Sequence, residues 1–129
     1  MADDSHYNSA LAASELVSIL RPEEKEKEFA KSIREIENQI PLIPNERQKK
    51  KVQLLLEKTY FLWMKNDVLL AEDAKPAQKI NFYEQSIKNY FTFVDKYKGS
   101  SFAKAAEKNY LLALDKLKKL KENGQEQKN

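Results

Sequence analysis

The sequence predicts an all-α protein of about five helices, and three observations support this fold class. The 129-residue chain has only two glycines and four prolines, fewer turn-forming residues than a sheet-rich fold requires. Apolar residues recur at the three- and four-residue spacing of a helix face. A third of the residues are charged, which suits helices with solvated outer faces.

The clearest pattern is a five-position apolar ladder that appears twice, 54 residues apart. Its positions are separated by four, three, four and three residues, the spacing of neighbours on one helix face. Ser32 in the first copy corresponds to Ser86 in the second. The two ladders are Phe29, Ile33, Ile36, Ile40 and Ile43, and Tyr83, Ile87, Tyr90, Val94 and Tyr97. A duplicated helix–turn–helix predicts a repeat scaffold that presents surfaces and catalyses no reaction.

The first two helices are expected over residues 5–20 and 22–40. The first ends before Pro22, because a residue that precedes proline avoids the helical region. Pro22 then suits the first turn of the second helix, and the prolines at 41 and 44 end it in a turn over 41–45. The side chains of the first helix expected to face a core are Leu11, Leu16, Ile19 and Leu20.

The third helix is expected over about 46–71, and residues 72–77 form a polar connector. The side chains placed on its inner face are Val52, Leu55, Leu56, Tyr60 and Trp63. Its apolar stretch from Val52 to Ala71 is interrupted by four charged residues and one asparagine, which would be costly in a bilayer. The stretch is therefore interpreted as a buried helix, with no transmembrane segment.

The fourth helix is expected over about 77–97, and Gly99 is a stop signal after it. Ser100 or Ser101 then caps a fifth helix that runs to about Lys121. Its inward side chains are Phe102, Ala106, Tyr110, Ala113, Leu117 and Leu120. Residues 122–129 are polar and are predicted to be a disordered tail. The whole is interpreted as one domain over 1–121, with repeat-like units at about 23–71 and 77–121.

The sequence lacks the residues that several kinds of catalytic and metal-binding site require. The chain has no cysteine, which removes disulfides, zinc thiolate sites and thiol nucleophiles. His6 is the only histidine, and with Asp3 or Asp4 it would form only a terminal cluster without fixed geometry, so no metal site is predicted. No Glu-x-x-His pair, glycine-rich phosphate loop or hydrolase elbow is present. We therefore expect no enzyme, no catalytic residue and no cofactor.

The segment from Tyr83 to Tyr110 resembles the tetratricopeptide-like repeats of the BamD (YfiO) outer-membrane assembly lipoproteins. The matching positions are Ile87, Tyr90, Tyr97, Ser100, Phe102, Ala103 and Ala106. Lys98 and Gly99 stand where that family has proline and Asp or Asn, and no lipobox cysteine is present. The resemblance covers roughly the last half of the chain, residues 23–65 more faintly, and the first twenty not at all.

This resemblance implies a non-catalytic scaffold that binds the barrel-bearing subunit of outer-membrane protein assembly. It also implies a periplasmic protein, peripheral to the outer membrane in its full-length form, and a signal peptide with a lipobox in the full-length gene would favour this interpretation. A cytoplasmic location stays open, because a cysteine-free chain suits either redox environment.

The candidate partner-binding residues lie off the second ladder, on a stripe through positions 82, 86, 89, 93 and 96. They are Phe82, Asn89, Phe93 and Lys96. Aromatic side chains on a polar face are candidates for a partner contact. Packing against a neighbouring helix is the equal alternative. The ladder tyrosines are expected in the core, since aliphatic residues replace most of them in the other copy.

The sequence also allows two functions other than a scaffold. Clusters of basic residues could meet the phosphates of nucleic acid; they are Arg47, Lys49, Lys50 and Lys51, and Lys116, Lys118, Lys119 and Lys121. Core positions interleave with both clusters, and a net charge of +3 is small, so this role is less favoured. The chain could also self-associate, and residues 1–20 either cap the array or pair with a second copy.

Overall fold

The computed structural model describes residues 4–127, with side chains described as far as Gly124. It confirms an all-α fold of five α-helices. They are α1 (Ser5–Ser18), α2 (Pro22–Gln39), α3 (Glu46–Asp73), α4 (Pro76–Lys96) and α5 (Ala103–Gln127), with a short 3-10 helix, η1 (Ile40–Leu42), after α2. The chain divides into two compact units between Tyr60 and Phe61, so the boundary falls inside α3.

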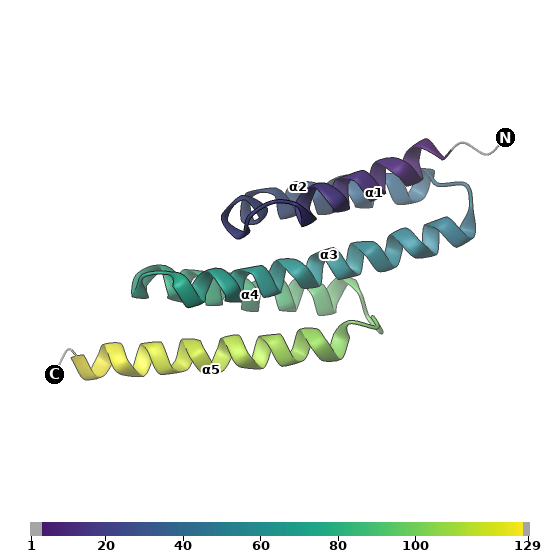
Figure 1. Cartoon of the computed structure of the whole chain (residues 1–129). Helices are drawn as coiled ribbons and strands as arrows, with labels where there is room; N and C mark the ends of the chain where they lie inside the picture. The colour runs from purple at the N-terminus through teal and green to yellow at the C-terminus, as the bar shows by residue number, and fades with distance from the viewer. Residues whose placement is uncertain (1–3, 128–129) are drawn as a thin grey trace. The chain divides into compact units, whose positions relative to one another are not determined.

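In the first unit, α1 and α2 pack side by side as an antiparallel hairpin (Figure 1). The buried residues of α1 are Ala10, Ala13 and Val17. The predicted inward residues Leu11, Leu16 and Ile19 are instead exposed, Ile19 by 73%, and Leu20 is half-buried. The prediction chose the largest apolar side chains, whereas the face of α1 that meets α2 carries mainly small ones.

The first ladder is confirmed as a core face of α2 and the turn that follows. Phe29, Ile33, Ile36 and Ile43 are buried, and Ile40 is half-buried. Asn45 is the N-cap of α3, and its side-chain Oδ1 accepts a hydrogen bond of 3.0 Å from the backbone N–H of Gln48. This N-cap satisfies a donor that the first turn of a helix leaves without a partner.

The connector between α3 and α4 is shorter than expected, since only residues 74 and 75 lie outside a helix. Gly99 ends the turn after α4 with a φ of 78°, the left-handed region that favours glycine. The Ser100 Oγ then accepts a hydrogen bond of 3.1 Å from the N–H of Phe102, just before α5. The helix α5 continues to Gln127 where a disordered tail was expected from residue 122; residues 128–129 lie outside the described part of the chain.

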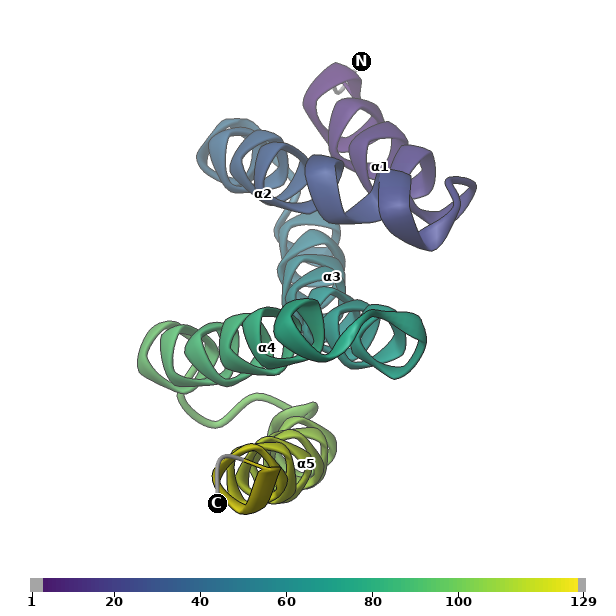
Figure 2. The ribbon, with the colours of Figure 1, turned by 90° about the vertical axis from the view of Figure 1, so that its left-hand side faces the viewer.

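The second unit combines the end of α3 with α4 and α5. The end of α3 and α4 form a second antiparallel hairpin, and α5 packs beneath it (Figure 2). One buried cluster of its core comes from all three helices and contains Val68, Ala71, Tyr83, Ala113 and Leu117. The half-buried Ile80, Phe82, Ile87 and Leu120 pack against this core. The inward face predicted for α5 is thereby largely confirmed.

Candidate functional site

The structure corrects the predicted partner-binding stripe of α4. Phe93 is completely buried and Asn89 is 4% exposed, so neither side chain is available to a partner in this structure. Phe82 is half-buried and packs against the core of the second unit. Only Lys96, in the last turn of α4, is exposed. Apart from Lys96, the stripe therefore packs against neighbouring helices, which was the alternative left open.

Hydrogen bonds explain why a polar stripe is buried. The Asn89 Nδ2 donates a hydrogen bond of 3.0 Å to the Asp67 carboxylate of α3. The Ser86 Oγ donates one of 2.9 Å to the backbone carbonyl of Met64, and it accepts one of 3.2 Å from the Asn109 side chain of α5. These bonds compensate the cost of taking polar groups out of water. The stripe thus joins α4 to α3.

The ladder of α4 faces α5 and includes an aromatic cluster. Tyr90 and Tyr110 stack with ring centroids 4.4 Å apart and an interplanar angle of 12°. Phe91 meets Tyr110 edge to face at 5.4 Å and is 53% exposed. Tyr83 is buried, whereas Tyr90 and Tyr97 are half-buried. Because α4 packs against helices on two faces, one ladder could not identify its whole buried surface.

The 54-residue period also relates α1, α3 and α5, which the ladder alone does not reveal. The buried residues of α1 are Ala10, Ala13 and Val17, and 54 positions later α3 has Met64, Asp67 and Ala71, which are buried as well. In the first hairpin these positions are buried on a helix that packs against α2, and in the second hairpin they lie on the face that α4 covers. The hydrogen bonds of Met64 and Asp67 to α4 place that helix directly over the face in the second hairpin.

The corresponding face of α5 is uncovered in the described part of the chain. A further step of 54 positions leads to Lys118 and Lys121, and Leu114 corresponds in the same way to the buried Tyr60. We define the α5 open face as the exposed residues at helical spacing along this side: Glu107, Leu111, Leu114, Lys118 and Lys121. Leu111 is 53% exposed and Leu114 is 41% exposed. Sequence reasoning missed this face because it placed α3 and α5 inward on one side only.

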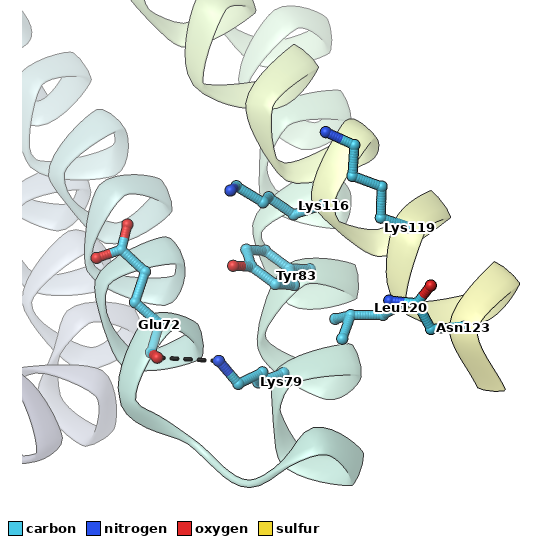
Figure 3. Close-up of a pocket in the computed structure, with 7 residues that line it drawn as sticks. All are labelled: Glu72, Lys79, Tyr83, Lys116, Lys119, Leu120 and Asn123. Carbon is cyan, nitrogen blue, oxygen red and sulfur yellow. Dashed lines mark hydrogen bonds between the residues drawn. The ribbon is translucent and has the colours of Figure 1, made fainter. Parts of the chain in front are cut away.

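A shallow pocket of about 410 Å³ lies elsewhere in the second unit (Figure 3). Its lining residues come from the end of α3, the start of α4 and the end of α5: Glu72, Lys79, Tyr83, Lys116, Lys119, Leu120 and Asn123. The Lys79 Nζ donates a hydrogen bond of 3.0 Å to the backbone carbonyl of Glu72. The second lysine cluster is therefore divided, with Lys116 and Lys119 at the pocket and the other two lysines on the α5 open face.

Two tyrosines of α4 have perturbed acidity. Burial, and then the nearby Glu72 carboxylate, raise the pKa of Tyr83 above its ordinary value. Burial also raises the pKa of Tyr90, with smaller contributions from Glu107 and Tyr110. A phenol with a raised pKa stays protonated at neutral pH and acts there as a neutral hydrogen-bonding group. Neither shift provides a general base.

His6, the only histidine, has its Nδ1 2.6 Å from the Gln39 Oε1, a contact that joins α1 to the end of α2. Across residues 4–127, no three His, Asp or Glu side chains come together in a way that could hold a metal ion. Within the same residues, no helix has the length and apolar character needed to cross a membrane.

Comparisons of the chain with protein families, with characterised proteins and with solved structures return no match.

Proposed function

We propose that this protein is a non-catalytic protein–protein interaction scaffold that binds a partner helix on the α5 open face. One observation carries the proposal: positions that are buried in α1 and α3, each of which packs against the helix that follows it, are exposed in α5. Helical repeats bury a continuous core by stacking neighbours, so an uncovered repeat face is a natural place for another helix to bind.

The chemistry of the α5 open face fits a helical partner. Leu111 and Leu114 are one helical turn apart and would supply the apolar centre of the contact. Burial of their exposed apolar surface contributes about 25 cal/mol per Å² removed from water. Lys118 and Lys121 lie toward the C-terminal end of the face and would pair with acidic side chains of the partner.

We propose further that the partner belongs to outer-membrane protein assembly. This part is supported by the resemblance of the segment from Tyr83 to Tyr110 to BamD-type repeats, which implies a barrel-bearing assembly subunit as the partner. A periplasmic location follows from the same proposal.

A pull-down from detergent-solubilised envelope of the source organism, read out by mass spectrometry, tests both parts. The wild-type protein should recover a barrel-bearing assembly subunit, and Leu111→Glu should lose it. Leu69→Glu is the matched control, because Leu69 is a similarly exposed leucine on α3 of the same unit. Equal recovery with Leu111→Glu and wild type would contradict the α5 open face as the binding surface. Recovery of nucleic acid or ribosomal protein in place of an envelope subunit would contradict the outer-membrane part.

A further inference from the structure

The α5 open face is complementary to itself between Glu107 and Lys118, and Lys121 lies beyond this segment. Read along the helix, the segment begins with Glu107, continues with Leu111 and Leu114, and then reaches Lys118. These four residues are separated by four, three and four positions, so their spacing is symmetric about the midpoint between the two leucines. The two end residues carry opposite charges. A second helix laid antiparallel on this segment would place Glu107 opposite Lys118 and Leu111 opposite Leu114.

We propose that the α5 open face also binds α5 of a second copy of this chain, packed antiparallel, when no other partner helix occupies it; this rests on the proposed function. A two-fold axis between Leu111 and Leu114 relates the copies, so the interface is isologous and closes as a dimer. The two leucines of each copy form its apolar centre. A Glu107–Lys118 ion pair closes each end.

The charges set the orientation. Neither Glu107 nor Lys118 forms an ion pair with another described residue, so both carry charge available to a partner. A parallel arrangement would place Glu107 against Glu107 and Lys118 against Lys118, which is repulsive. The antiparallel arrangement also repeats the geometry that this chain uses in its own hairpins, where α2 covers α1 and α4 covers α3.

The test is the molar mass of the full chain across a concentration series up to about 1 mM, since a contact limited to one helix face is weak. Sedimentation or light scattering should show the 15.1 kDa monomer rising to twice that mass. Glu107→Lys alone and Lys118→Glu alone should each remain monomeric, because each variant places like charges at both ends. Lys108→Glu is the charge-matched control, on an exposed α5 position outside the face, and should dimerise like wild type.

Mixing the two single variants gives the sharpest result. In a mixed pair, the lysine introduced at position 107 of one variant would meet the glutamate introduced at position 118 of the other. At the other end of the interface, the unchanged Lys118 and Glu107 would meet as they do in the wild-type dimer. The equimolar mixture should therefore form dimers although neither variant does so alone. The double variant E107K/K118E should dimerise for the same reason.

Two results would overturn the inference: a wild-type chain that stays monomeric throughout the series, or single variants whose mixture does not associate. Such a result leaves the proposed function standing if Leu111→Glu still abolishes recovery of the envelope partner while Leu69→Glu does not. If that pull-down also shows no effect of Leu111→Glu, the proposed function fails together with the dimer.

Discussion

At the scale of single residues, polar side chains of this protein are buried where they find a hydrogen-bond partner, alongside the apolar side chains of the core. Asp67, Ser86 and Asn89 are buried because each finds a partner across the α3–α4 contact. Phe93 lies on the same face of α4 and is buried with them. The polar stripe of α4 therefore faces α3 and not solvent, and its side chains form a buried hydrogen-bond network between the two helices.

Phe93→Ala should therefore act on stability. Deleting a fully buried phenylalanine leaves a cavity and typically costs about 3–5 kcal/mol, a large part of the stability of a small domain. Phe91→Ala is the control, because that ring is half exposed, and it should cost much less. Urea denaturation followed by circular dichroism measures both. Equal losses of unfolding free energy in the two variants would contradict the burial assigned to Phe93.

The raised pKa of Tyr83 predicts a loss of stability in alkaline solution. The unfolded chain has the ordinary tyrosine pKa, so it releases the phenolic proton first as pH rises above about 10. The contribution of Tyr83 to stability is fully present below that pH and is lost as pH rises through the folded pKa.

Glu72→Gln should lower the pKa of Tyr83 and leave Tyr90 unchanged, since the shift of Tyr90 comes from burial, Glu107 and Tyr110. Glu107→Gln should have the opposite selectivity. Titration of the tyrosine ring carbons by NMR resolves the two residues. A shift of both tyrosines in either variant would show that the carboxylates do not act locally.

At the scale of helices, the number and order of the helices could be predicted well from the sequence. Their buried faces and their end residues could be predicted less well. Proline and glycine residues between the helices allowed all five helices to be located, because these residues restrict where a helix can begin or end. The inward face of α1 was missed because its buried residues are small, and small residues carry little hydrophobic signal. Most of the stripe predicted to bind a partner on α4 is buried because periodicity identifies one buried face, whereas α4 packs on two; the α5 open face was missed because α5 was given a single inward face. The end of α5 differed because Glu, Gln and Lys favour helix even without a core contact.

The two glycines should respond to substitution with opposite signs. Gly99→Ala should destabilise the protein by about 1 kcal/mol, because alanine pays a penalty at a φ of 78°. Gly124→Ala should be neutral or stabilising by up to about 1 kcal/mol, because Gly124 lies within α5, where alanine is the better helix former. No atom lies within 4 Å of an added Cβ at either position, so backbone conformation alone decides the sign. Thermal melting measures the pair, and a gain in melting temperature for Gly99→Ala would contradict the turn geometry.

At the scale of the whole molecule, a 54-residue period gives three related helices, α1, α3 and α5; α2 packs against the first of them and α4 against the second. This grouping differs from the units predicted at about 23–71 and 77–121, because each hairpin pairs a helix with the one that follows it. In the described part of the chain, α5 packs against α4 but has no following helix to cover its open face. The central claim is that the α5 open face binds another helix.

Site-specific photo-crosslinking along α5 in living cells tests this claim most directly. A photoreactive side chain is placed in turn at each position from 107 to 118, and the crosslinked products are identified by mass and sequence. Crosslinks should peak at positions 107, 111, 114 and 118 and be weak at 108 and 115, giving the period of one helix face. Crosslinks that ignore this period, or that are absent from the face, would contradict the claim.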